Sequence, residues 1–184
     1  MTDIISVPAH RLRAPADERR QISAAAPQLI RGVELLFFAY RDFTGEADAV
    51  LAEFGLGRAH HRVLHFVNRN PGLKVQDLLQ ILKITKQSLA RVLKLLLDQG
   101  WIRQVAGDAD RRQRLLHTTD KGAALAGRLD ALQAKRIAQA LAAAGPGSEA
   151  AVLSFLFAMI VPEERAVVEA LLPAAIEATA ASAG

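Results

Sequence analysis

Residues 73–122 decide the fold, and they read LKVQDLLQILKITKQSLARVLKLLLDQGWIRQVAGDADRRQRLLHTTDKG. Within this stretch apolar residues recur twice at i, i+3, i+4 and i+7, the spacing that places side chains on one face of an α-helix. The first set is Val75, Leu78, Leu79 and Leu82, and the second set is Leu89, Val92, Leu93 and Leu96. Two amphipathic helices of this length, separated by a short turn, are typical of a helix-turn-helix.

The second of these helices carries polar residues on the face opposite its apolar stripe. Thr85 is expected to cap its first turn, because a hydroxyl can accept a backbone N–H that has no partner there, and Gly100 is expected to end it. Side-chain amides, hydroxyls and cations can bond to base edges and phosphates in a major groove. The alternative interpretation is an ordinary solvated helix face. We predict DNA contacts from this helix at Thr85, Lys86, Gln87, Ser88, Arg91 and Lys94.

Two short strands with a basic turn between them follow the second helix. Residues 101–105 are an aromatic and β-branched run suited to a strand, and residues 115–118 are a weaker candidate. The turn contains three arginines, and an arginine-tipped hairpin can lie along a minor groove, where the negative potential attracts cations. A charged surface turn is the alternative, but the two helices and the basic ribbon together predict a winged helix-turn-helix. The candidate DNA contacts of the wing are Asp110, Arg111, Arg112 and Arg114.

These residues resemble the MarR family of transcriptional regulators. The resemblance covers about residues 29–141 and is carried by residues 56–64, 74–79, 84–89, 96–102, 110–112 and 119–122. The wing of the family commonly reads Asp-x-x-Asp-Arg-Arg, with the Gly of a Leu-Thr-x-x-Gly ten residues later, and Arg112 and Gly122 keep that spacing. Two departures exist: Asp108 precedes Asp110 by one residue fewer than is usual, and Thr118 replaces the usual Leu.

The resemblance implies a ligand-responsive repressor that binds double-stranded DNA as a homodimer on a pseudo-palindromic operator. It also implies that Asp110 braces a wing arginine while Arg111 or Arg112 enters the minor groove. The alternative is a winged-helix module that contacts only other proteins, which would not require a basic wing tip. An enzyme would need a catalytic constellation, and no Ser–His–Asp order, paired-carboxylate pattern or phosphate-binding glycine loop stands out. We therefore predict a regulator without catalytic residues.

The segments on either side of the winged helix-turn-helix predict a homodimer. From Pro27, which is expected in the first turn of a helix, one apolar face runs to Phe54, and a second apolar set lies off that face. A helix that is apolar on more than one side is buried on more than one side. Residues 152–161 carry no charge, and an exposed apolar patch of this kind is typical of an oligomer interface.

The predicted architecture is mainly α with a small β wing. An N-terminal arm of residues 1–24, with one short helix near residues 17–24, precedes a single domain of residues 25–184. In this domain a winged helix-turn-helix of about residues 56–118 lies between dimerisation helices of about residues 27–54 and 119–180. The expected local signals are Gly45 as a weak point of the first helix, Thr119 and Ser148 as caps, and Pro162 as a helix start.

Composition bounds the function and the location. Of the 184 residues 51% are hydrophobic, which is enough for a folded core. The net charge is only +4, but residues 83–121 hold nine Lys or Arg against four Asp, so basic charge concentrates in the DNA-facing segment. Cysteine is absent, which excludes thiol-based sensing and Cys-ligated metal. No secretory signal or membrane span is evident, and we expect a cytoplasmic protein without a membrane partner.

The resemblance further implies control by a small, often aromatic, anionic ligand, bound where the dimer helices meet the winged domain. Aromatic side chains could hold its ring, and a cation could meet its carboxylate, although the same aromatics could simply be core. His61 and His65 lie at i, i+4, a spacing able to hold a metal. No His-Glu-x-x-His pattern exists, and we predict no metal and no cofactor. The candidate ligand contacts are Phe37, Phe38, Tyr40, Arg41, His61, Arg62 and His65.

Overall fold

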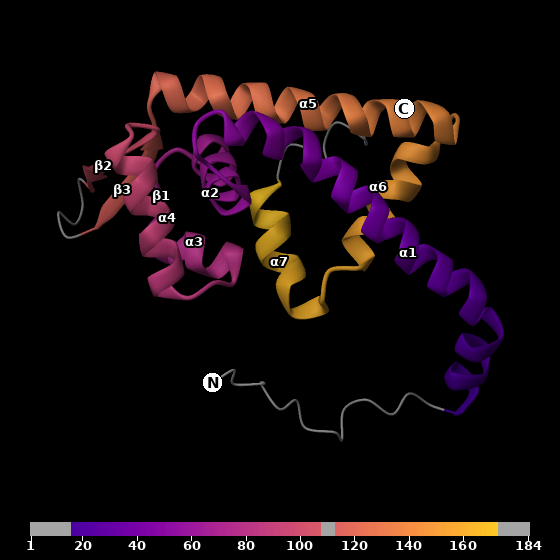
Figure 1. The fold of residues 1–184 in the computed structure, drawn as a ribbon. Helices are drawn as coiled ribbons and strands as arrows, with labels where there is room; N and C mark the ends of the chain where they lie inside the picture. Colours follow the sequence, from indigo (N-terminus) through magenta and orange to yellow (C-terminus); the bar gives the residue numbers. More distant parts are fainter. Residues whose placement is uncertain (1–15, 108–112, 173–184) are drawn as a thin grey trace, which may run out of the picture. The chain divides into compact units, whose positions relative to one another are not determined.

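The computed structural model describes residues 16–107 and 113–172, which are mostly helical with one small sheet (Figure 1). The helices are α1 (Ala16–Ala52), α2 (Arg58–Arg69), α3 (Val75–Leu82), α4 (Lys86–Asp98), α5 (Asp120–Ala144), α6 (Ser148–Ala158) and α7 (Pro162–Leu171). The strands are β1 (Leu73–Lys74), β2 (Ile102–Ala106) and β3 (Arg114–Thr118). The chain divides between Asp42 and Phe43 into two compact units, and the second unit holds the helix-turn-helix and the wing.

The first helix, α1, differs from the prediction at its start. It begins at Ala16, so the short helix expected near residues 17–24 and the helix expected from Pro27 are one. Pro27 lies inside α1 and not in a first turn, and the prediction of a helix start there is wrong. Three alanines precede Pro27, and their high helix propensity favours continuation through a residue that usually interrupts a helix. The helix also continues through Gly45, and residues 1–15 of the predicted arm lie outside the described residues.

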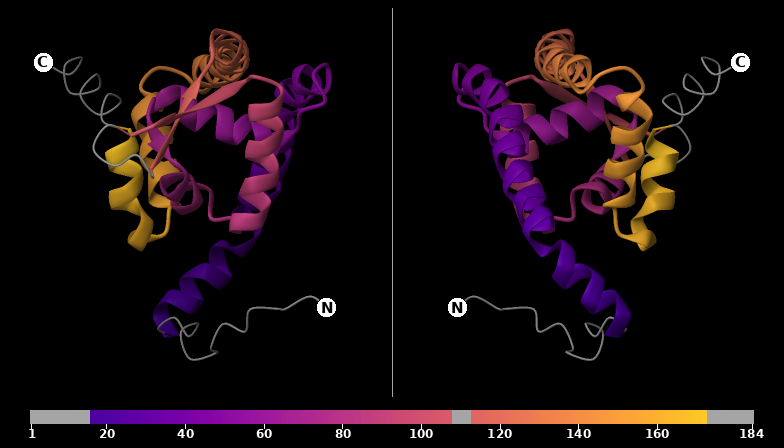
Figure 2. Two further views of the ribbon diagram at one scale, coloured as in Figure 1. Left: turned by 90° about the vertical axis from the view of Figure 1, so that its left-hand side faces the viewer. Right: turned by 90° about the vertical axis from the view of Figure 1, so that its right-hand side faces the viewer.

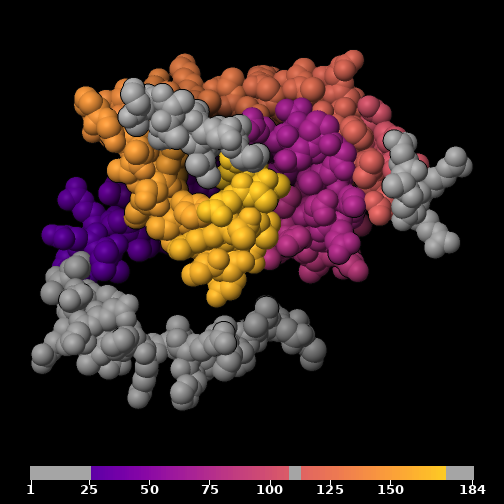
Figure 3. Space-filling model, turned by 180° about the vertical axis from the view of Figure 1, so that it is seen from behind, coloured from indigo at the N-terminus to yellow at the C-terminus, as the bar shows by residue number. Residues whose placement is uncertain are grey.

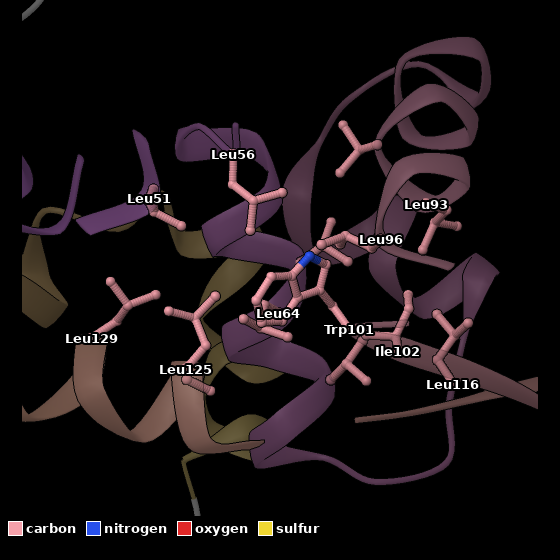
Figure 4. Close-up of a cluster of buried hydrophobic side chains, with 14 of the residues drawn as sticks. Leu51, Leu56, Leu64, Leu93, Leu96, Trp101, Ile102, Leu116, Leu125 and Leu129 are labelled. Carbon is pink, nitrogen blue, oxygen red and sulfur yellow. The ribbon is translucent and has the colours of Figure 1, made fainter. Parts of the chain in front are cut away.

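The core of the second unit confirms the two apolar stripes of the helix-turn-helix. Leu78 and Leu82 of α3 are buried, as is the whole predicted stripe of α4. Figure 4 shows Leu93 and Leu96 of α4 in one cluster with Trp101 and with leucines of α1, α2 and α5. Fully burying one such aliphatic side chain contributes about 1.5–3 kcal/mol. Because α3 and α4 share this core, the polar face of α4 has a defined orientation.

The wing is a three-stranded antiparallel sheet in the order β1-β3-β2. β2 pairs with β3 from Ile102↔Thr118 to Ala106↔Arg114, which confirms both predicted strands. β1 consists only of Leu73 and Lys74, which pair with Leu116 and Leu115 of β3. This strand was not predicted, because two residues show no periodicity that a sequence pattern can reveal.

The start of α5 lies directly against the base of the wing. Thr119 caps the helix as predicted: its Oγ1 accepts the N–H of Gly122 at 3.1 Å and donates to the carbonyl oxygen of Gly100 at 2.7 Å. Gly122 packs so closely on the backbone of Trp101 that a Cβ at this position would overlap the Trp101 carbonyl oxygen. The junction between wing and α5 is therefore fixed by one hydroxyl and by the absence of one side chain.

The helices after α5 differ from the prediction in one respect, the cap of α6. Ser148 does not cap α6, because Gly147 at φ +78° takes the cap position and the Ser148 hydroxyl donates to the carbonyl oxygen of Leu141 at 3.1 Å. α7 begins at Pro162 as predicted, whereas residues 173–180 of the predicted helical region lie outside the described residues. Figure 2 shows α4 and the α6–α7 pair on opposite sides of the second unit. Of the described helices, none alone is long and apolar enough to cross a membrane, and only α5 with α6, bent by 118°, passes that test as a pair.

Candidate nucleic-acid interface

The position of α4 is set by its cap and its buried stripe. Thr85 Oγ1 accepts the N–H of Ser88 at 3.1 Å and donates to Ser88 Oγ at 2.9 Å, which confirms Thr85 as the cap. Both hydroxyls predicted to contact DNA are thus already bonded to each other at the start of the helix. They fix the first turn, where backbone N–H groups and a positive helix dipole favour an anion such as a phosphate.

The exposed face of α4 carries the predicted amide and cations. Lys86, Gln87 and Arg91 are exposed, and in the parts of the chain that the structure describes neither Lys86 nor Arg91 makes an ion pair. Lys94 is also exposed, but its Nζ donates to Asp98 Oδ2 at 2.5 Å. An exposed i, i+4 pair of this kind is weak, so Lys94 can leave Asp98 for a phosphate at small cost. The charge on this face is strongest at the first two turns of the helix.

One described arginine of the wing, Arg114, lies on the same face of the sheet as Gln104. Directly opposite residues of antiparallel strands share a face of the sheet, and Arg114 lies opposite Ala106, two residues from the pair Gln104↔Leu116. Leu116 is fully buried, so this face is the inner one, and toward the tip of the wing it exposes Gln104 and Arg114. Beyond the last pair of the two strands, the Gly107 N–H donates to the Gln113 carbonyl oxygen at 3.1 Å. The predicted contacts Asp110, Arg111 and Arg112 lie outside the described residues.

A groove of about 800 Å³ separates α4 from α3 and β2. Its lining includes apolar side chains, two of the cations predicted to contact DNA, and two amides, Gln76 and Gln104, that were not among the predicted contacts. The groove is lined by Val75, Gln76, Leu79, Lys86, Ala90, Leu93, Lys94, Leu97, Asp98 and Gln104. Gln104 is the polar residue brought here by the fold alone, because strand alternation puts it on the face of the wing that α4 meets.

The residues predicted to hold a small ligand fall into two groups, one in each unit. In the first unit Phe37, Phe38 and Tyr40 are 55–70% exposed, so the alternative that they are core is wrong for this chain by itself. Arg41 Nε donates to Asp42 Oδ1 at 2.7 Å, and its guanidinium lies 5.1 Å from the centroid of the Phe38 ring.

In the second unit the predicted ligand residues lie on α2. Arg62 donates to the carbonyl oxygen of Leu82 at 3.4 Å. His65 Nδ1 lies 2.9 Å from Asp130 Oδ1 of α5, a partner 65 residues away that no sequence pattern announces. Burial lowers the pKa of His61, as does the nearby His65, while Asp130 and Asp48 oppose that change. In the described residues no group of three His, Cys, Asp or Glu is arranged to hold a metal.

Comparison with known proteins agrees with this geometry. A family model described as MarR family matches residues 54–113. The HTH-type transcriptional regulator PetP of Rhodobacter capsulatus is 47% identical over 138 residues, which are 75% of this chain and 83% of PetP. The chain belongs to the MarR family. This membership confirms the resemblance seen in the sequence. The MarR-family protein is a transcriptional regulator and not an enzyme.

Solved structures with a similar fold include two complexes. FabT of Streptococcus pneumoniae, in complex with DNA, has a TM-score of 0.58 at 20% identity over 68% of this chain and 90% of FabT. The MarR family protein Rv2887 of Mycobacterium tuberculosis, in complex with salicylic acid, has a TM-score of 0.50 at 26% identity over 66% of this chain and 90% of Rv2887. The winged helix-turn-helix fold of the MarR-family protein is thereby confirmed.

Proposed function

We propose that this MarR-family protein is a homodimeric repressor that binds a pseudo-palindromic operator in double-stranded DNA through α4 and the wing. The observation that carries the proposal is the exposed face of α4. It combines two cations without an ion-pair partner among the described residues and an exposed amide on a helix that is capped and held by a buried stripe. Such a rigid polar helix beside a basic ribbon fits a major groove with an adjacent minor groove.

The proposed contacts divide by chemistry. Gln87 and Arg91 can read base edges, because an amide pairs with adenine and a guanidinium with guanine in bidentate geometry. Lys86, Lys94 and Arg114 would bind phosphates, and Thr85 and Ser88 would hold the first turn in place. On the resemblance alone, Asp110 would brace the wing while Arg111 or Arg112 enters the minor groove.

The proposed dimer rests on unpartnered apolar surface. α6 has no buried residue, and Phe155, Met159 and Val161 are each more than half exposed. Apolar residues of the first half of α1 are exposed as well, among them Leu29, Ile30, Val33 and Leu35. A second copy of the chain would cover these surfaces in a two-fold arrangement, which also places two copies of α4 about one turn of DNA apart.

The proposed ligand is a small aromatic anion, as the salicylic acid complex of Rv2887 suggests for that protein. The two groups of candidate residues are proposed separately. In the first unit the exposed aromatic residues near Arg41 could hold the ring and Arg41 the carboxylate, and in the second unit Arg62 or a protonated histidine of α2 could bind the carboxylate. A thermal-shift screen of aromatic carboxylates followed by DNA competition tests this. A compound that stabilises the fold but leaves DNA affinity unchanged is not an inducer.

The experiment that tests DNA binding is a salt titration of duplex binding with matched variants. Lys86→Ala should weaken binding to every sequence and lower the salt slope by about one. Gln87→Ala or Arg91→Ala should cost about 1–3 kcal/mol and change the preference at particular base pairs. Lys135→Ala is the control, because this exposed lysine lies in α5, about 22 Å along the helix from its start. A protein–protein module would show no measurable affinity for any duplex.

A further inference from the structure

The turn between α3 and α4 contains an unusual backbone conformation. Lys83 has φ +53° and ψ +43°, and it is the one residue other than Gly at positive φ in the described chain. Its N–H still donates to the carbonyl oxygen of Leu79 at 3.0 Å, and its left-handed backbone ends α3. Helices that end in this way usually have Gly at that place, and occasionally Asn, because a side chain there is disfavoured. The presence of Lys therefore calls for an explanation in its side chain.

The side chain of Lys83 reaches the C-terminal helix. Its Nζ donates to Glu164 Oε1 at 2.8 Å, across 81 residues of sequence. The Glu164 side chain is 32% exposed and that of Lys83 is 58% exposed, so the pair is partly shielded from water. In Figure 3 the yellow surface of α7 adjoins the magenta surface of α2 and α3.

The segments that carry Lys83 and Glu164 are each held by other contacts. Glu164 lies in the first turn of α7, which Pro162 opens, and the next residue, Arg165, donates from Nε to the Ile160 carbonyl oxygen at 3.0 Å and from Nη2 to that of Ala158 at 2.9 Å. On the other side, Arg62 of α2 donates to the last carbonyl oxygen of α3. Thr85, the cap of α4, follows two residues after Lys83. The pair therefore joins the α6–α7 corner to the turn that sets the start of α4.

We propose that Lys83 and Glu164 are positioning residues for DNA binding, whose ion pair within one chain fixes α4 relative to the C-terminal helices. This inference rests on the proposed function. Because the C-terminal helices carry the surface proposed for dimerisation, the pair would help to hold the two copies of α4 at the spacing of the operator half-sites. An ion pair of this exposure changes an equilibrium about 2- to 5-fold.

A charge-swap cycle tests the proposal. Lys83→Glu and Glu164→Lys should each weaken operator binding about 2- to 5-fold, and the double variant should restore it. Glu163→Lys and Lys135→Glu make the same changes in net charge at exposed positions of α7 and α5 and correct for the effect of charge alone. If Lys83 instead contacted a phosphate directly, the double variant would remain weak, and that result would overturn the proposal.

A glycine variant separates positioning from stability. Lys83→Gly removes the side chain and relieves the disfavoured backbone, so it should raise the melting temperature while lowering DNA affinity. Equal or higher affinity in Lys83→Gly would overturn the proposal. A wild-type protein that binds no duplex would instead refute the proposed function, and this inference would fall with it.

Crosslinking tests the contact without DNA. The chain has no cysteine, so a Lys83→Cys and Glu164→Cys double variant can be treated with a short bismaleimide. We expect a crosslink within one chain, seen as a protein of monomer size on a denaturing gel that yields one linked peptide pair on digestion. A linked dimer, or no link at all, would contradict the contact.

Discussion

Replacing Gly122 by Ala would place a methyl group against the backbone of Trp101 at the junction of wing and α5. The added Cβ overlaps the Trp101 carbonyl oxygen and lies 2.9 Å from the carbonyl carbon and 3.5 Å from Leu64 Cδ1. That carbonyl cannot easily move, because it accepts the N–H of Thr119 at 3.1 Å and also its hydroxyl at 3.3 Å. Overpacking of this kind costs about 1–3 kcal/mol.

The expected net effect is smaller than the overlap alone suggests. Because the overlap with the Trp101 carbonyl oxygen is severe, we expect an overpacking cost in the upper half of this range, about 2–3 kcal/mol. Ala is a better helix former than Gly by about 1 kcal/mol, so Gly122→Ala should lower the free energy of unfolding by about 1–2 kcal/mol. Gly127 offers a matched control in the same helix, because a Cβ there meets no atom within 4 Å. Gly127→Ala should therefore raise the free energy of unfolding by up to about 1 kcal/mol.

Urea denaturation followed by tryptophan fluorescence measures the stability of both variants with a probe at the junction of the wing and α5. Trp101 is the single tryptophan of the chain and is 3% exposed. Its ring lies edge-on to Phe54 at 5.2 Å, and the Lys121 ammonium lies 3.7 Å from the ring centroid. Unfolding should shift its emission to longer wavelength. If Gly122→Ala were as stable as wild type, or stabilised like Gly127→Ala, the close packing of α5 on the wing base would be refuted.

Three further substitutions test the cap of α4, the burial of the α2 histidines and the apolar face of α6. Thr85→Ala removes the cap of α4 and should lower the free energy of unfolding by about 0.5–2 kcal/mol, together with DNA affinity; unchanged urea midpoints would contradict the cap. Burial lowers the pKa of His60 and of His61, so the unfolded chain binds protons more readily and the melting temperature should fall as pH drops below about 6.5. His61→Asn should reduce that fall. If the variant and the wild type lost melting temperature identically with pH, His61 would not contribute to the acid sensitivity. Phe155→Glu places a charge on the exposed apolar face of α6 and should yield monomers in sedimentation velocity, whereas an intact dimer would exclude this face from the interface.

Local signals explain what the sequence could predict. Thr85 and Thr119 were recognisable as caps because a cap depends on one side chain and the backbone of the following turn. The apolar stripes were recognisable because the residues of each stripe recur at the period of the helix. Leu78 of the first stripe and Leu96 of the second are fully buried in the structure. These features need no knowledge of any distant segment.

The features that were missed depend on distant or competing contacts. The pairs His65–Asp130 and Lys83–Glu164 each join helices far apart in the sequence, and no spacing rule connects their members. Pro27 was misplaced because the helix propensity of its neighbours outweighs its own tendency to interrupt a helix. The α4 residues of the proposed DNA contacts could be named from the sequence, whereas the place of Gln104 in the groove beside α4 became visible only from the strand register.

The most direct test of the central claim is selection of bound duplexes from a random DNA library by the purified protein. A two-fold dimer that reads DNA with α4 should enrich an inverted repeat whose half-site centres lie about 10 base pairs apart, or a multiple of that spacing. Gln87→Ala or Arg91→Ala should change the enriched half-site at particular positions. Enrichment of no sequence, or of a motif without two-fold symmetry that neither variant alters, would contradict the account.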